Sequence, residues 1–254
     1  MKRKPTKKSA STSKYSAVPP KEATPAKTEK PAVKIELPTP ATATPTVAKT
    51  PAKAPAIESK PAAMIDINPL LSDLGSIETS TRLSAAIALG RAGNRAGTAS
   101  LIFTLRDSDA DVACESAAAL GALGDPAAVE PLMEVLNNNE GYFHSVVRAA
   151  AAHSLAQLGD TRAVEPLINA VGDLDAEPSA EAIRALATLG DARATHSLIN
   201  VVKNHTGYYT GVARRAAVLA LAQLGGEQAK AALAAVATDS NEDAVIREAA
   251  GGAI

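Results

Sequence analysis

A short turn recurs along most of this sequence at regular intervals, and no other feature constrains the fold as strongly. The turn reads RAGN, ALGD, QLGD, TLGD and QLGG, and successive copies end 31, 35, 31 and 35 residues apart. An internal period of about 20 to 50 residues is typical of solenoids and other repeat proteins. Units of this length hold two short helices, which bury their apolar faces only by stacking on neighbouring units. The period therefore predicts an all-α solenoid.

Each interval is predicted to hold two helices, an A helix followed by a B helix. Segments such as PAAVEPLMEVL and VVRAAAAHSLAQLG carry apolar residues at helical spacing. Gly124 and Gly159 fall just past two predicted B helices, where a left-handed residue closes the last turn without a Cβ clash. Asp125 and Asp160 follow at once and are expected to cap the next A helix. One tripeptide thus ends one helix and begins the next.

Two prolines occupy the same place in successive A segments. Pro131 and Pro166 each stand six residues after the aspartate of the turn. A proline inside a helix removes a backbone hydrogen bond and bends the helix. The repeated position therefore predicts bent A helices.

The segment VVRAAAAHSLAQLGDTRAVEPLINAV resembles the HEAT-like repeats of the bilin lyases of phycobilisomes. The resemblance covers about residues 66 to 254 and implies an all-α, HEAT-like α-solenoid of about six two-helix repeats, spanning residues 65–254. The last repeat stops at REAAGGAI and is incomplete, as expected of a fragment or naturally truncated chain, or of an end that packs on something else. The resemblance also implies an alternative function, that of a bilin lyase-like chaperone subunit that cradles a phycobiliprotein and its chromophore.

Residues 1–64 differ in composition from the rest of the chain. Residues 1–60 hold 13 Lys and Arg against 4 Asp and Glu, a net charge of +9, and 10 of the 16 prolines, whereas the remainder has a net charge of −10. Such a segment buries too little apolar surface to offset the entropy of ordering, so we expect a disordered, basic, Pro-rich tail. Its charge predicts weak contact with nucleic acid or another polyanion through residues 1–60.

Several classes of function find no support in the sequence. No run of 18 apolar residues occurs and no apolar stretch follows the basic start, so we expect a cytoplasmic protein without a membrane span. Phosphate-binding loops, nucleophile elbows and zinc-ligand spacings are absent as well. The related deoxyhypusine hydroxylases hold iron with His-Glu pairs, and none of the four histidines here precedes a glutamate. We therefore predict no cofactor, no metal and no enzymatic activity, a lyase-type activity implied by the resemblance being the main exception.

Aromatic residues are concentrated in two predicted connections between an A and a B helix. Tyr142 and Phe143, with Tyr208 and Tyr209, are four of the six aromatic residues and belong to two copies of a Gly-Tyr-aromatic motif. Both motifs lie in units that are four residues longer than their neighbours. Two interpretations remain open. Either each motif covers the apolar ends of its own helices, or the rings and the adjacent His144 are surface anchors for a protein partner.

Arginine recurs on the predicted B helices, where Arg82, Arg148 and Arg214 each stand twelve residues before the turn. Asp109 and Asp175 stand sixteen residues before it and are expected to cap B helices. The arginines again have two interpretations. They form a ladder that joins stacked units through loop carbonyls and acids, or they form a cationic stripe for an acidic partner.

Together these patterns favour a non-enzymatic scaffold or adaptor that binds protein partners through the solenoid surface and the aromatic connections. The alternatives are the bilin lyase-like subunit and polyanion association through the tail. The candidate partner-binding residues are Tyr142, Phe143, His144, Arg148, Tyr208, Tyr209 and Arg214.

Overall fold

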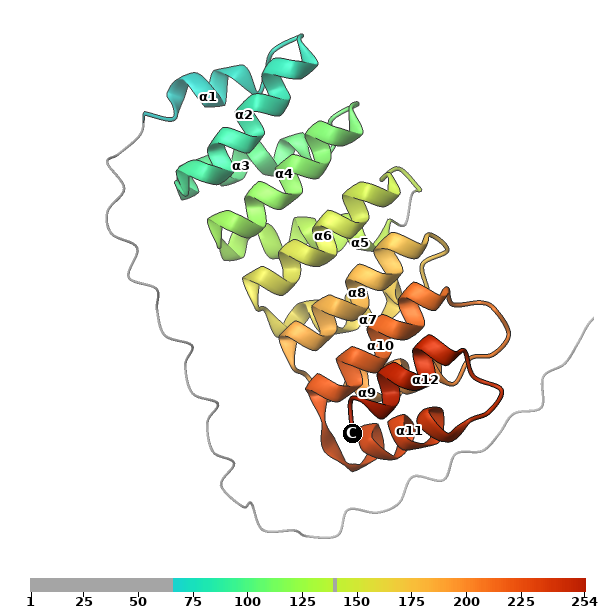
Figure 1. Ribbon diagram of the computed structural model, residues 1–254. Helices are drawn as coiled ribbons and strands as arrows, with labels where there is room; N and C mark the ends of the chain where they lie inside the picture. The colour runs from blue at the N-terminus through green and yellow to red at the C-terminus, as the bar shows by residue number, and fades with distance from the viewer. Residues whose placement is uncertain (1–65, 139–140) are drawn as a thin grey trace, which may run out of the picture. The chain divides into compact units, whose positions relative to one another are not determined.

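The computed structural model describes residues 66–138 and 141–254, so the prediction of a disordered tail over residues 1–64 lies outside the described residues. Within the described ranges, twelve α-helices and three short 3₁₀ turns are present and no strand occurs. The helices form six consecutive pairs. The prediction of an all-α, HEAT-like solenoid of about six two-helix repeats is therefore confirmed (Figure 1).

Each pair consists of a short A helix and a longer B helix, except that the last pair reverses this order of length. The A helices are α1 (Asn68–Asp73), α3 (Thr98–Thr104), α5 (Val129–Asn137), α7 (Val164–Ala170), α9 (Ala194–Val202) and α11 (Gly226–Thr238). The B helices are α2 (Thr79–Ala92), α4 (Ala110–Leu123), α6 (Ser145–Leu158), α8 (Ala176–Leu189), α10 (Gly211–Leu224) and α12 (Ala244–Gly251). The first five B helices each have 14 residues, as expected for copies of one unit.

The helices from α1 to α12 form two layers. The B helices stack side by side in chain order from α2 to α10, and the A helices form a second layer behind them (Figure 1). Helix α12 packs against α10 and α11. Because every B helix runs in the same direction, the A-to-B connections gather along one edge of the stack and the B-to-A turns gather along the other.

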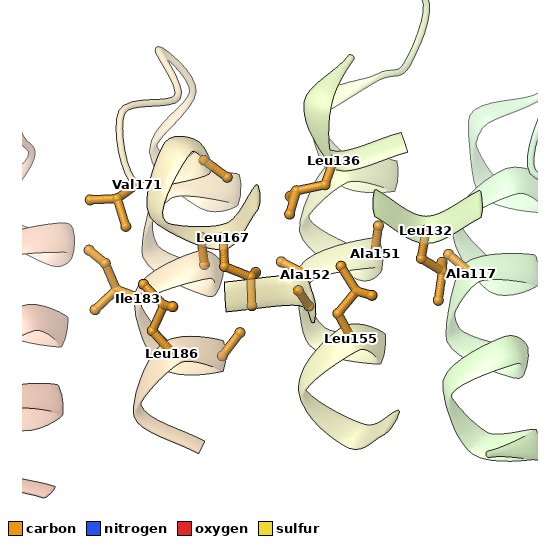
Figure 2. Packing of buried hydrophobic residues seen from close by; sticks show 14 of the residues in the cluster. Ala117, Leu132, Leu136, Ala151, Ala152, Leu155, Leu167, Val171, Ile183 and Leu186 are labelled. Atoms are coloured by element: carbon orange, nitrogen blue, oxygen red, sulfur yellow. The ribbon is translucent and has the colours of Figure 1, made fainter. Parts of the chain in front are cut away.

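The core lies between the two layers and between successive units. Leu155, Leu167 and Leu186 have no exposed surface, and Figure 2 shows them reaching across from neighbouring helices. Burial of a leucine side chain contributes about 1.5 to 3 kcal/mol. Because helices of successive units pack against one another, stability accumulates along the stack.

Small residues set the distance between stacked B helices. Gly121 of α4 faces α6 so closely that a Cβ at this position would lie 2.7 Å from the Ser154 Oγ atom. Ala117 and Ala151 are fully buried at the same junction. Larger side chains here would separate the helices and expose the leucines beneath, which explains the abundance of alanine in the B helices.

Glycine ends the B helices as predicted. Four of these residues adopt the left-handed conformation with φ between 63° and 69°: Gly93, Gly124, Gly159 and Gly190. The following aspartates also cap, since the backbone N–H of Ala127 donates to Asp125 at 3.0 Å and that of Arg162 donates to Asp160 at 2.9 Å. The caps begin a 3₁₀ turn, not the A helix itself, and this turn leads into the A helix.

The two recurring prolines stand in the first turn of a helix and not in its interior, so the predicted interior position was wrong. Pro131 and Pro166 are the third residues of α5 and α7, because the 3₁₀ turns η2 (Pro126–Ala128) and η3 (Thr161–Ala163) precede these helices. The first N–H groups of an α-helix have no intrahelical acceptor, so a proline here forfeits no hydrogen bond. A proline at this position therefore gives no reason for a bend.

Candidate partner-binding surface

From the second pair onward, the A-to-B connections alternate in length and chemistry along the solenoid. Residues 138–144 and 203–210 connect the helices of the third and fifth pairs, whereas only residues 105–109 and 171–175 connect those of the second and fourth. We call the first, third and fifth pairs odd units and the others even units. The aromatic motif belongs to the third and fifth units. The recurring arginine belongs to the first, third and fifth units, and Arg247 holds the equivalent place in the sixth.

The two aromatic residues of each odd connection have different surroundings. Phe143 is buried in the core, and Tyr209 is partly buried and packs against it. Tyr142 and Tyr208 are 52% and 56% exposed. The rings within each pair meet edge to face, with centroids 5.2 Å apart in the third unit and 4.9 Å apart in the fifth. Each motif therefore covers its own helices with the second ring and presents the first ring to solvent.

Both exposed tyrosines are fixed by a hydrogen bond to the preceding even unit. The Tyr142 hydroxyl donates to the carbonyl oxygen of Arg106, and the Tyr208 hydroxyl donates to that of Gly172, both at 2.9 Å. The two bonds join equivalent positions of the repeat. Each ring is thus held in one orientation while half of its surface stays open.

Arg106 adds a cation to the first of these aromatic pairs. Its guanidinium carbon lies 5.8 Å from the centroid of the Tyr142 ring and 5.3 Å from that of Phe143. The same guanidinium group forms an ion pair with Glu134 of α5. The even-unit turn and the odd-unit connection are therefore joined by a cation–π contact and an ion pair as well as by the tyrosine hydroxyl.

The recurring arginine of each odd unit extends to the following even unit. The Arg148 Nε and Nη2 atoms both donate to the carboxylate of Asp173 at 2.8 Å, and Nη2 also donates to Asp175 at 2.8 Å. Its Nη1 atom donates to the carbonyl oxygen of Phe143, also at 2.8 Å. Arg148 is only 8% exposed, so this bidentate pair is largely shielded from water.

The same link occurs at the two ends of the stack. Arg82 Nε and Nη2 donate to the Asp107 carboxylate at 2.7 and 2.8 Å. Arg214 Nη1 donates to Glu242 at 2.8 Å, and Nη2 donates to the carbonyl oxygen of Val202 at 2.7 Å. Three arginines of odd units thus pair with acids of even units, which agrees with the ladder interpretation.

The ladder shifts the ionisation of its acids. Hydrogen bonds from the Arg82 guanidinium lower the pKa of Asp107 below its usual value. Burial alone would raise the pKa of Asp173, but the hydrogen bonds from Arg148 and from the backbone N–H of Asp175 outweigh it, and this pKa is also lowered. Both carboxylates are therefore ionised at neutral pH, and each arginine faces a full negative charge.

His144 stands at the N-cap position of α6, is exposed, and makes no capping hydrogen bond with its side chain. It borders a pocket of about 350 Å³ together with Tyr142, Phe143 and residues of the preceding even unit, among them Leu105 and Asp107. The structure thus brings three of the predicted binding residues together at one opening between the second and third units.

The predicted caps of the B helices are only partly realised. The Asp109 carboxylate accepts hydrogen bonds from the backbone N–H groups of Asp111 and Val112, as expected. Asp175 occupies the N-cap position of α8, but its side chain caps nothing, because its carboxylate binds Arg148 instead. The stronger charge-assisted pair displaces the cap.

The seven predicted binding residues therefore fall into two groups. Arg148 and Arg214 are buried and paired inside the chain, so they offer no cationic stripe at the surface, and Phe143 and Tyr209 support the connections from within. The residues that face solvent are Tyr142, His144 and Tyr208.

One surface was missed at the sequence level. Arg184 of α8 and Arg215, Val212 and Leu219 of α10 line a pocket of about 460 Å³ between these two B helices. Val212 and Leu219 share their helix face with Arg215 and Gln223, so the sequence pattern of this face is mixed. The packing of α10 against α8 leaves the Val212 and Leu219 side chains exposed to solvent.

No metal centre or membrane helix is found in the part of the chain that the structure describes. No group of three or more His, Cys, Asp or Glu side chains there has an arrangement that suits a metal ion. Among the same residues, no helix is both long and apolar enough to cross a bilayer.

Comparison with solved structures supports the fold. A chain in the complex of CpcE and CpcF of phycocyanin lyase from Nostoc sp. PCC7120 is similar to this chain at 25% identity, with a TM-score of 0.55, covering 82% of this chain and 80% of that one. A designed armadillo repeat protein in complex with the peptide (KR)4 shares 16% identity and a TM-score of 0.52, covering 74% and 98%. The second likeness concerns the fold alone.

Comparison with sequences identifies the repeats. No curated protein sequence matches the chain. The family model for PBS lyase HEAT-like repeats matches residues 213–239, and the model for HEAT repeats matches residues 67–143 and 143–210. Because the HEAT matches cover more than half of the sequence, the chain belongs to the HEAT repeat family.

Proposed function

We propose that this chain is a non-enzymatic, cytoplasmic scaffold that binds a protein partner along the edge formed by its A-to-B connections. The observation that carries the proposal is the row of exposed apolar side chains on this edge. Four connections contribute one each, with exposed fractions from 52% to 94%. We call these residues the loop edge: Ile77, Tyr142, Leu174 and Tyr208.

The spacing of the loop edge suits an extended partner surface. Packed helices lie about 8 to 10 Å apart, so the two tyrosines, which are two units apart, are separated by roughly 20 Å. Large exposed apolar side chains in a row are unusual on a monomer and typical of interaction sites. Tyrosine at the centre of an interface often supplies much of the binding energy.

The fixed hydroxyls favour binding further. Each tyrosine ring already lies in one orientation through its bond to the neighbouring unit, so a partner that covers the ring orders little that was free before. Lower ordering cost leaves more of the contact energy as affinity. His144 beside Tyr142 adds a hydrogen-bonding group at the same opening.

The test is affinity capture from an extract of the native host, with the full chain as bait and mass spectrometry as the readout. We expect the wild-type chain to retain a defined partner, and the double variant Tyr142→Ala with Tyr208→Ala to lose it. The matched control is His196→Ala, which removes an exposed ring from α9, outside the A-to-B connections. Equal capture by the double variant and the control would overturn the assignment of the loop edge.

A second candidate is a bilin lyase-like chaperone subunit. It is favoured by the PBS lyase HEAT-like match at residues 213–239 and by the similarity to a chain of the CpcE and CpcF complex. In this role the solenoid holds a phycobiliprotein while its chromophore is attached. Co-expression with a phycobiliprotein and a bilin source separates the two candidates. New visible absorbance on the phycobiliprotein that depends on this chain supports the lyase role, and its absence excludes it.

Polyanion contact by residues 1–60 remains a further proposal, supported by the net charge of +9. Binding of this kind weakens steeply as salt concentration rises, because it releases counterions. Titration of labelled DNA with the full chain at about 50 and 200 mM salt tests it. Binding that is absent at the lower concentration would contradict this proposal without affecting the loop edge.

A further inference from the structure

A groove of about 460 Å³ lies between α8 and α10 on the solvent side of the B layer. Its lining comes from these two helices alone and includes Arg184, Ala187, Val212, Arg215, Leu219 and Gln223. It lies on B-helix surfaces, whereas the loop edge consists of A-to-B connections. The groove is therefore a second surface, separate from the one assigned above.

Two positions on the α10 wall hold apolar side chains where the equivalent positions of α8 hold charged ones. Val212 and Leu219 are 63% and 55% exposed and stand seven residues apart, which places them two turns apart on one face. The corresponding positions of α8, in the preceding unit, hold Glu177 and Arg184. Exposed Val and Leu contribute little to folding stability, and apolar side chains grouped at one groove are typical of interaction sites.

The groove is also basic, although the solenoid as a whole is acidic. Arg184 and Arg215 contribute guanidinium groups from opposite walls. Arg184 pairs with Glu181 on its own helix and remains 52% exposed at its side chain. For Arg215 no ion pair is found within residues 66–138 and 141–254, which leaves its charge available to a ligand.

We propose that this groove binds an acidic segment of a partner protein, which inserts an aliphatic or aromatic side chain against Val212 and Leu219 and places a carboxylate on Arg215. The inference rests on the scaffold function proposed above and adds a second contact to it. Charge complementarity selects this occupant. The chain's own residues 1–60 carry a net charge of +9, so the two arginines would repel them, and this segment is not the expected occupant.

The experiment selects peptides from a displayed random library against the immobilised full chain, with the partner left unspecified. We expect enriched sequences to combine Asp or Glu with Leu, Ile or Phe. Their affinity for the variants Arg215→Glu and Leu219→Asp should fall at least about tenfold, while binding to Arg91→Glu stays unchanged. Arg91 is a matched control because it is an exposed arginine on α2, at the other end of the B layer.

Exchanging the charges of the peptide and of residue 215 tests the ion pair directly. Replacing the acidic residues of an enriched peptide by Lys should abolish binding to the wild-type chain and restore it to the Arg215→Glu variant. Thermal melts of each variant establish that the fold is intact, which is expected because both substituted side chains are largely exposed.

Enriched peptides without acidic residues, or peptides that bind Arg215→Glu as tightly as the wild type, would overturn the inference. Light scattering that shows a dimer of the full chain, dissociated by Arg215→Glu, would also overturn it in favour of a second copy as occupant. These outcomes are distinguishable from failure of the scaffold function, because host-partner capture by the loop edge is measured separately with the tyrosine variants.

Discussion

The connections of odd and even units have opposite chemistry. Odd units supply donors, namely the Arg148 guanidinium and the hydroxyls of Tyr142 and Tyr208. Even units supply acceptors, namely the carboxylate of Asp173 and the carbonyl oxygens of the short turns. The structural repeat is one helix pair, but the chemical repeat is two. Arg148 also bonds the Phe143 carbonyl oxygen of its own unit, and Arg106 of an even unit pairs with Glu134 of an odd one, but the bonds from odd-unit donors to even-unit acceptors recur along the stack and join neighbouring units.

The short turn of an even unit is consequently held from both sides. Residues 105–109 receive Arg82 from the first unit and the Tyr142 hydroxyl from the third. Residues 171–175 receive Arg148 and the Tyr208 hydroxyl in the same way. The arginine side of this clamp is buried and the tyrosine side is half exposed, so we expect the arginine to control stability and the tyrosine to contribute to binding.

Removal of the buried arginine should have the largest effect on stability. The Arg148→Ala substitution leaves the mostly shielded Asp173 carboxylate without its partner. Breaking a fully buried pair costs about 3 to 5 kcal/mol, so we expect a loss up to that size. Urea unfolding followed by circular dichroism measures the change. Arg162→Ala is the control, since its pair with Asp160 is exposed and should cost less than about 1 kcal/mol. Equal effects of the two substitutions would show that the ladder does not join the units.

Acid should weaken the same contact. The pKa values of Asp107 and Asp173 are lowered in the folded chain, so their contribution is fully present above the unfolded aspartate pKa of about 3.9 and is lost as the pH falls through the folded values. Unfolding free energy should therefore be steady from about pH 5 to 7 and decline below about pH 4. In Arg148→Ala the decline should be smaller. An identical acid profile for both proteins would refute the role of this pair.

Loss of the tyrosine hydroxyls should have the smallest effect. Tyr142→Phe and Tyr208→Phe each remove one hydrogen bond to a carbonyl that solvent can reach, at a cost of about 1 kcal/mol or less. Thermal melts measure the change against the wild-type chain. A loss well beyond that of an ordinary neutral hydrogen bond, from either substitution, would mean that the tyrosine side of the clamp is as important as the arginine side.

The sequence predicted the fold well because its signals are local. The turn glycines need a left-handed backbone, so Gly124 and Gly159 mark helix ends whatever the tertiary contacts. For Arg148 the sequence left two interpretations, a ladder between units and a cationic stripe at the surface. The choice depends on which residue lies beside it in the folded chain. Asp173 belongs to the next unit, and its closeness follows only from how units stack. The position of Pro131 was misjudged because a 3₁₀ turn resembles the start of an α-helix in sequence.

The binding surface was less predictable for the same physical reason. Tyr142 and Phe143 are adjacent and chemically alike, yet one is half exposed and the other buried, a difference set by the neighbouring turn. Leu174 and Ile77 are single apolar residues in short connections and carry no periodic signal. Val212 and Leu219 share a mixed face with Arg215 and Gln223, which gives no clear periodic signal. In all these cases the exposure of the side chain depends on how the neighbouring unit packs against it.

The most direct test of the central claim measures stability and binding on the same protein. For the Tyr142→Ala, Tyr208→Ala double variant, the melting temperature and the dissociation constant of the captured partner are determined together. We predict a fall of only a few degrees in melting temperature, and binding weaker by about thirtyfold, near 2 kcal/mol. A strongly destabilised variant whose folded fraction binds the partner normally would contradict the account, because the tyrosines would then serve the fold alone.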